Sequence, residues 1–234
     1  MIMRKHYKQY LAEFIGTAVL VFVTCLETVL TRDEGMVGSI ATALCSGLTL
    51  AVLYYAFFNL KAYFNPAVTV SMLINGKTSV IVGLWQLFSQ TLGAVCGILL
   101  VAPVGGWADL GGTTIQPTLA VTPFDGVLLA LVIEFVITFI LALAYLTEDK
   151  SRGIGGIIVG FASVGTTVFA FNFTGASANP ARSLCTALLE LIGGNVASIS
   201  CVWIYLLAPI LGGIFAGIVK RYILKPPTAK IDRL

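Results

Sequence analysis

Long apolar runs separated by short polar connections dominate the chain. The six longest runs each approach or exceed the ~20 residues that cross a membrane as one helix. They cover about residues 10–30, 37–58, 80–102, 124–146, 154–173 and 199–222. Two further apolar stretches, at about 66–74 and 180–191, are too short to cross and indicate helices that enter the membrane partway. The pattern predicts an all-α membrane protein with six transmembrane helices and two re-entrant half-helices.

Composition supports this interpretation. Of 234 residues, 58% are hydrophobic and 11% are charged, whereas about a quarter of the residues in a soluble domain are charged. The single histidine, His6, and five cysteines scattered singly through apolar runs offer no metal site and no histidine-based catalytic centre. We therefore expect a lipid bilayer as the surrounding medium. We expect no enzymatic activity, cofactor, metal or nucleic-acid partner.

The basic residues predict the orientation in the membrane. Most of them lie in segments that six spans place on one side: Arg4, Lys5, Lys8, Lys61, Lys77, Lys150, Arg152, Lys220, Arg221, Lys225, Lys230 and Arg233. By the positive-inside rule this side is the cytoplasm. Both termini are then cytoplasmic tails, at 1–8 and 223–234. We found no targeting signal, which suggests the plasma membrane.

The chain also contains an internal repeat. Residues 11–17 (LAEFIGT) are echoed by residues 132–138 (VIEFVIT), and Asn65-Pro66-Ala67 is echoed by Asn179-Pro180-Ala181. Each half contains three spans, so the second half enters the membrane from the opposite side. The sequence predicts one domain over 1–234, built as an inverted 3+3 repeat with halves at about 8–103 and 124–222. In such folds the functional site lies between the halves, near the membrane midplane.

Each tripeptide starts one of the short apolar stretches. Asn65 and Asn179 can cap free backbone N–H groups, and Pro66 and Pro180 suit the first position of a helix. The positive ends of both helix dipoles would then meet at the midplane and disfavour cations. The two Asn amides could donate hydrogen bonds to a passing molecule and interrupt a chain of proton transfer. One such tripeptide is explained by capping alone, but two in matching places predict a pore.

With these motifs the chain resembles the major intrinsic proteins, the aquaporins and aquaglyceroporins, over nearly its whole length. Residues 12–17, 90–94 and 208–213 are similar to family motifs in the first, third and sixth spans. The resemblance implies a passive channel for water and other small uncharged solutes that excludes ions and protons. It also implies a homotetramer with one pore per subunit.

Arg182 is the first candidate for a selectivity filter. It lies in the first turn of the second half-helix, and a charged side chain within a membrane usually faces a cavity or a partner. In the family this position matches the arginine of the narrow external filter. The same resemblance gives Thr167, Ala176 and, depending on the alignment, Cys45 or Ser46 as the other three members.

These three small residues favour a wide opening. A channel mainly for glycerol or another small neutral solute is therefore an alternative to a water channel. The signature of glycerol channels is incomplete, because Ser183 stands where typical members have Asp. A second departure precedes Asn65, where Lys61 and Tyr63 replace the usual glycine and histidine. These two are either ordinary interfacial residues or a cytoplasmic constriction.

Glu13 and Glu134 occupy equivalent positions in the two halves. Asn65 lies 52 residues after Glu13, and Asn179 lies 45 residues after Glu134. A buried carboxylate could mark an ion- or proton-coupled secondary transporter. We favour a structural role, in which each carboxylate accepts hydrogen bonds from the irregular backbone leading into a half-helix.

Overall fold

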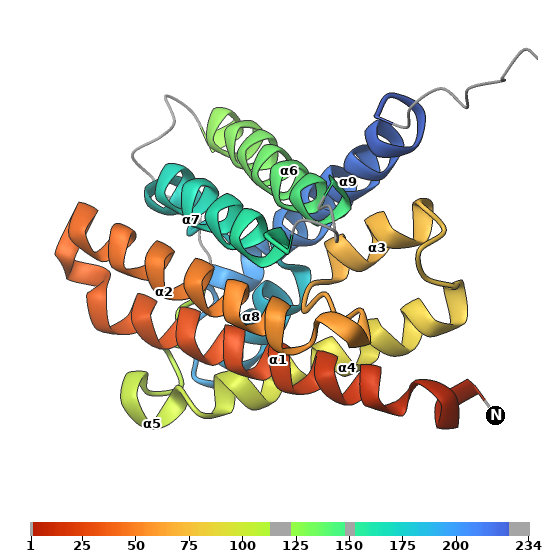
Figure 1. The fold of residues 1–234 in the computed structure, drawn as a ribbon. Coiled ribbons are helices and arrows are strands. Elements are labelled where there is room, and N and C mark those ends of the chain that lie inside the picture. The colour runs from red at the N-terminus through yellow and green to blue at the C-terminus, as the bar shows by residue number, and fades with distance from the viewer. Residues whose placement is uncertain (1, 113–122, 148–152, 225–234) are drawn as a thin grey trace, which may run out of the picture.

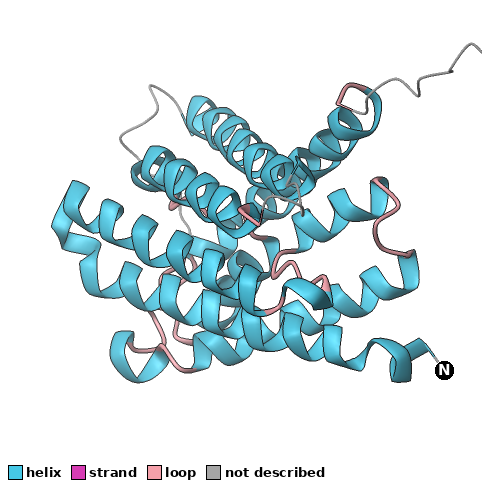
Figure 2. Cartoon of the chain, viewed as in Figure 1, coloured by secondary structure: helices cyan, strands magenta, loops and turns pink. Residues whose placement is uncertain are grey.

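The computed structural model describes residues 2–112, 123–147 and 153–224, and every regular element in these ranges is helical (Figure 2). The long helices are α1 (Ile2–Thr31), α2 (Gly35–Ala56), α4 (Val80–Leu99), α6 (Pro123–Thr147), α7 (Gly155–Thr174) and α9 (Ala197–Tyr222). Two shorter helices, α3 (Pro66–Ile74) and α8 (Pro180–Ile192), are the half-helices. Single turns are formed by η1 (Arg32–Glu34), η2 (Phe58–Leu60) and α5 (Ala102–Gly105).

The long helices match the six predicted spans. Five continuous helical segments of the described chain are long and apolar enough to cross a membrane, and the first of them, His6–Ala56, has 51 residues. This segment contains α2 and α1 from His6 onward, and the two helices pack against each other on either side of η1. Large apolar side chains such as Val52, Phe88 and Phe161 are more than half exposed on the outside of the bundle. Such a surface suits lipid rather than water.

One helix extends beyond its predicted span. Helix α1 begins at Ile2 and continues without interruption into the first span, so residues 2–8 of the expected tail are helical. This segment contains no glycine or proline, and its Met, Arg and Lys residues favour helix. Hydropathy alone detects the apolar part of a helix and misses a polar extension of this kind.

The helices form two halves with matching contacts. Within the first half α1 packs on α2 and α4, and within the second α6 packs on α7 and α9. Figure 1 shows α1, α2 and α4 below, α6, α7 and α9 above, and the half-helices between them. Each half-helix packs on the last helix of the opposite half, α3 on α9 and α8 on α4. This is the inverted repeat that the sequence predicts, with the half-helices held at its centre.

The two halves are in close backbone contact where α2 crosses α7. A Cβ atom added to Gly160 would lie 2.7 Å from the Cβ of Ala51 and 2.8 Å from the carbonyl oxygen of Gly47. A Cβ atom on Gly47 would in turn lie 2.7 Å from the carbonyl oxygen of Gly160. Membrane helices use such small residues to bring their backbones into contact. Because glycine has no side chain, Gly47 and Gly160 allow the backbones of α2 and α7 to pack this closely.

We predict that Gly160→Ala destabilises the protein by about 1–3 kcal/mol, the usual cost of overpacking a tight contact. Gly165→Ala on the same helix is the matched control, because a Cβ atom there has nothing within 4 Å. Thermal unfolding of the purified protein in detergent would measure both variants. Equal unfolding temperatures for the two variants would contradict the predicted contact.

Candidate functional site

The amino termini of α3 and α8 meet in the middle of the bundle. Asn65 caps α3, its Oδ1 accepting from the backbone N–H of Ala67 at 2.9 Å. Asn179 caps α8, its Oδ1 accepting from Ala181 N at 3.1 Å and Arg182 N at 3.4 Å. Each helix has proline at its first position, as the sequence predicts. Both asparagines are nearly buried, so their amides are fixed by protein contacts.

The two asparagines also bind the two halves to each other. The Nδ2 atom of Asn65 donates to the carbonyl of Ala178 at 2.7 Å, and that of Asn179 donates to the carbonyl of Phe64 at 2.9 Å. Phe64 and Ala178 immediately precede the asparagines and have left-handed φ values of 59° and 47°. An L-residue in this conformation costs of the order of 1–2 kcal/mol. The surrounding hydrogen bonds must offset that strain.

A cavity of about 50 Å³ passes in front of both asparagines. One N–H of each amide is used in the bond between the halves, and the second has no partner among the described residues. The cavity is lined by Leu20, Val21, Thr24, Ser46, Leu50, Tyr63, Asn65, Leu141, Tyr145, Ser163, Thr166, Thr167, Ala176, Ser177, Ala178, Asn179 and Arg182. Leu20, Val21, Leu50 and Leu141 give it apolar wall on α1, α2 and α6, and hydroxyl, amide and guanidinium groups provide hydrogen-bonding positions among them.

The filter positions inferred from the sequence lie together on this cavity. Arg182, Thr167 and Ala176 all line it, and at the fourth position it is Ser46 that does so. Cys45 is absent from the lining. The hydroxyl of Ser46 donates to the carbonyl of Ala43 at 3.2 Å, so its oxygen remains able to accept a hydrogen bond.

The guanidinium group of Arg182 is held by loop carbonyls rather than by an acid. Its Nη1 lies 3.5 Å from the carbonyl oxygen of Ala176, and its Nη2 lies 3.4 Å from that of Gly111. Its Nε has no partner in the described part of the chain. A guanidinium carries five N–H donors. Donors are therefore left for a molecule in the cavity.

Glu13 accepts hydrogen bonds from the backbone that leads into α3. Its two oxygens accept from Tyr63 N at 2.8 Å and from Phe64 N at 2.7 Å. Gln86 and Gln90 of α4 donate to the same carboxylate at 2.8 and 2.9 Å. Glu13 is fully buried, and it satisfies two backbone N–H groups of irregular backbone that need a partner inside the membrane.

Glu134 has the same relation to the backbone that leads into α8. Its Oε1 accepts from Ser177 N at 3.0 Å and from the hydroxyl of Thr174 at 2.7 Å, and its Oε2 accepts from Ala178 N at 2.9 Å. It is fully buried and does not line the cavity. Each of the two equivalent carboxylates thus binds the strained residue that precedes an asparagine.

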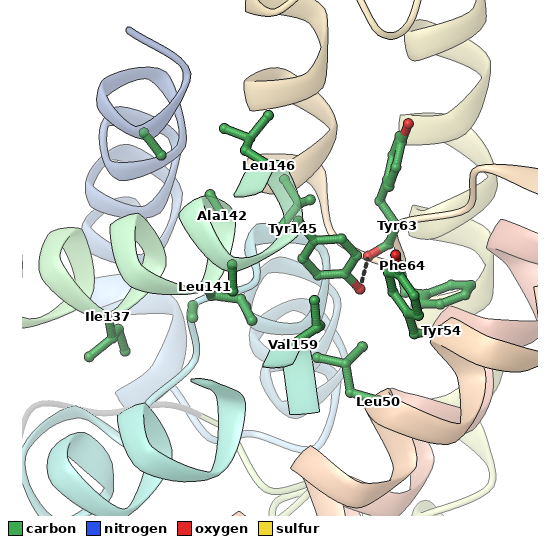
Figure 3. Close-up of a cluster of buried hydrophobic side chains, with 14 of the residues drawn as sticks. Leu50, Tyr54, Tyr63, Phe64, Ile137, Leu141, Ala142, Tyr145, Leu146 and Val159 are labelled. Atoms are coloured by element: carbon green, nitrogen blue, oxygen red, sulfur yellow. Dashed lines mark hydrogen bonds between the residues drawn. The ribbon is translucent and has the colours of Figure 1, made fainter. Parts of the chain in front are cut away.

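Two tyrosines lie between the central cavity and a second one. The second cavity has a volume of about 290 Å³ and is lined by Tyr54, Phe58, Lys61, Ala62, Tyr63, Met72, Gly76, Lys77 and Tyr145. Tyr63 and Tyr145 line both cavities. Their ring centroids are 6.2 Å apart with an edge-to-face geometry, and the hydroxyl of Tyr145 donates to the carbonyl of Tyr63 at 3.3 Å (Figure 3).

Comparison with known proteins shows the family to which this architecture belongs. The sequence model described as major intrinsic protein matches residues 2–220. Aquaporin-4 of Mus musculus is 33% identical over 238 residues, covering 97% of this chain and 71% of that protein. Glycerol uptake facilitator protein-like 6 of Lactiplantibacillus plantarum is 31% identical over 219 residues, covering 92% of this chain and 97% of that protein. The chain belongs to the major intrinsic protein family.

A solved structure agrees with this assignment at the level of the fold. The aquaglyceroporin from Plasmodium falciparum is similar with a TM-score of 0.82 and 22% identity, covering 94% of this chain and 98% of that chain. As a major intrinsic protein, the chain is a passive channel and not an enzyme. In the described residues no group of three or more His, Cys, Asp and Glu side chains could hold a metal ion.

Two residues of this major intrinsic protein, Tyr145 and Glu190, are buried at positions where the sequence did not indicate it. Tyr145 looks like an interfacial aromatic at the end of the fourth span, but it faces Tyr63 from a distant part of the chain. Glu190 looks like the polar face of a short helix, but it is only 2% exposed and accepts backbone hydrogen bonds from residues near 110. Repeat symmetry could find neither residue.

We predict that Glu134→Gln destabilises the protein by about 1–3 kcal/mol, the cost of leaving a buried donor unsatisfied. With the amide oxygen in the Oε1 position, the new NH₂ group would face the N–H of Ala178. Thermal unfolding in detergent would measure the loss. Glu27→Gln, at a partly exposed position on α1, is the control and should leave the unfolding temperature nearly unchanged. A Glu134→Gln variant as stable as the control would refute the assigned role.

Proposed function

We propose that this channel conducts water and small uncharged solutes of about the size of glycerol, and excludes ions and protons. The observation that carries the proposal is the single cavity lined by both asparagine amides, Arg182 and three small residues, Ser46, Thr167 and Ala176. The aquaporin and the glycerol facilitator among its relatives support a cargo of this class.

Exclusion of charge follows from the half-helices. The amino termini of α3 and α8 both point to the middle of the cavity, so two positive dipole ends act at one place. The free amide N–H groups of Asn65 and Asn179 donate to the oxygen of a passing water. A water whose oxygen accepts from both cannot also accept from its neighbour in the file, which breaks a chain of proton transfer.

Passage of larger neutral solutes follows from the filter. Arg182 supplies donors, while the small side chains of Ser46, Thr167 and Ala176 fill little of the cavity. A channel used mainly for glycerol or a similar solute is the second candidate, favoured by these small side chains. None of the four filter positions carries an aromatic ring to contact the carbon face of a polyol, so we place water first.

A coupled transporter is disfavoured by the positions of the acids. Glu13, Glu134 and Glu190 are buried, each accepts at least three hydrogen bonds, and none lines the cavity. A proton or sodium ion moving through the cavity would meet no carboxylate. Glu13 and Glu134 instead accept hydrogen bonds from backbone N–H groups.

We further propose a homotetramer in the plasma membrane, with one pore in each subunit and both termini in the cytoplasm. One domain, with repeat halves at about 8–103 and 124–222, would form each pore. The N-terminus and the end of α9 lie on the same side in Figure 1. Lys61 and Lys77 line the second cavity, which would then be the cytoplasmic vestibule.

Swelling and shrinkage of proteoliposomes in water, glycerol and urea gradients would test the cargo. We expect both water and glycerol to pass. Thr167→His, which fills the filter, should lower glycerol permeability roughly tenfold, equivalent to about 1.4 kcal/mol of barrier, and water permeability much less. Thr167→Ser is the matched control and should behave as the wild type. Water flux without glycerol flux in the wild type would contradict the wide filter.

We separately propose that Tyr63 and Tyr145 form a constriction between the central cavity and the vestibule beside Lys61. Tyr145→Ala should raise water permeability roughly twofold, as a barrier lower by about 0.4 kcal/mol would. Tyr145→Phe keeps the ring and should change permeability less. Stopped-flow light scattering on proteoliposomes would measure both. If neither Tyr145→Ala nor Tyr63→His changed the permeability, the constriction would be rejected.

A further inference from the structure

Glu190 is a third buried carboxylate, and its position differs from those of Glu13 and Glu134. It lies on α8, two turns beyond Arg182, and binds the segment that precedes residue 113. Its Oε1 accepts from Leu110 N at 2.8 Å and from Gly112 N at 2.9 Å. Its Oε2 accepts from the hydroxyl of Ser198 on α9 at 2.6 Å.

These hydrogen bonds flank the residue that contacts Arg182. Gly111 lies between the two N–H groups bound by Glu190, and its carbonyl oxygen is 3.4 Å from Nη2 of Arg182. Gly111 has a φ of +71°, and a Cβ atom there would lie 2.7 Å from the carbonyl oxygen of Cys25. The peptide is therefore confined by α1 on one side and oriented by Glu190 on the other.

Arg182 depends on this carbonyl because it has few other restraints. Its only other side-chain hydrogen bond within the described residues is the 3.5 Å contact to Ala176, and its Nε has no partner there. An arginine side chain has several rotatable bonds, so ordering its head group takes directed contacts. A displacement of the Gly111 carbonyl would release one end of the guanidinium into the cavity.

We propose that Glu190 is a positioning residue of the selectivity filter. By binding the two N–H groups on either side of Gly111, it aims the Gly111 carbonyl at Arg182 and so fixes the width of the opening. The inference rests on the proposed role of Arg182 in the filter. It assigns to Glu190 a part in choosing which solutes pass, although its side chain lines no part of the cavity.

Other contacts hold the same segment without orienting Gly111. Asn195 donates to the carbonyl of Ala108 at 2.8 Å, and Arg32 forms an ion pair with Asp109. Both anchor residues that precede Leu110. With these anchors in place, loss of the Glu190 carboxylate should loosen the Gly111 peptide without releasing the whole segment.

Glu190→Met tests the proposal, because methionine keeps the length of the side chain and cannot accept these hydrogen bonds. Water and glycerol permeability would be measured in proteoliposomes and expressed as the ratio of glycerol to water, which does not depend on the amount of protein inserted. We expect the ratio to rise by roughly threefold to tenfold, the effect of losing one hydrogen bond of ordinary strength. Glu190→Gln should restore the wild-type ratio, since its amide oxygen can accept from Leu110 and Gly112 and its NH₂ can donate to Ser198.

A double-mutant cycle with Arg182→Ala separates positioning from general damage. If Glu190 acts through Arg182, Glu190→Met should change the ratio in the wild type and leave it unchanged in Arg182→Ala. A purely structural role would lower both permeabilities together and would do so in either background. An unchanged ratio in folded Glu190→Met, or an equal change in both backgrounds, would overturn the proposal.

The same measurements distinguish failure of the proposed filter from failure of the proposed role of Glu190. If Arg182→Ala alone leaves the ratio unchanged, the proposed filter fails, and the inference about Glu190 fails with it. If Glu190→Met does not yield folded protein, Ser198→Ala removes only the partner of Oε2 and should raise the ratio by a smaller amount that disappears in Arg182→Ala. An unchanged ratio in Ser198→Ala would then overturn the role of Glu190 while leaving that of Arg182 intact.

Discussion

The structure depends on one requirement, that irregular backbone at the middle of a membrane must find all its hydrogen-bond partners inside the protein. The segments before Asn65 and Asn179 are not helical, and each contains left-handed residues. Glu13 and Glu134 accept from their N–H groups, and the two asparagine amides donate to their carbonyls across the interface of the halves. The chain can expose donors to a passing molecule only because these other groups are already paired.

The repeat supplies this arrangement twice, but the two copies are not used alike. Gly175, four residues before Asn179, takes a left-handed conformation that suits glycine, and the equivalent place before Asn65 is taken by Lys61. On the α8 side the cavity is bordered by small residues and Arg182, and on the α3 side by Tyr63 and Tyr145. Similar backbone geometry thus supports a polar opening at one end and an aromatic one at the other.

The fold was predictable because its signals are local. Apolar runs gave the spans, and the paired Asn-Pro steps gave the half-helices, with bounds close to those observed apart from the start of α1. The choice between Cys45 and Ser46 could not be made from the sequence, because two alignments gave positions one residue apart. Such a shift turns a side chain by about 100° around a helix, so only Ser46 lines the cavity. Tyr145 and Glu190 were missed for another reason. Their partners, Tyr63 and Leu110, lie about 80 residues away, and only tertiary packing shows that they meet.

The contact between Gly47 and Gly160 has a consequence for how such a channel changes its cargo. Because the backbones of α2 and α7 already touch there, these two helices cannot move closer, and a larger residue at either glycine would push them apart. Ser46 and Thr167 project into the cavity from these same two helices. Substitution of Ser46 or Thr167 can therefore change the space inside the pore without moving α2 and α7. The width of the pore then depends on the size of a few side chains that line it.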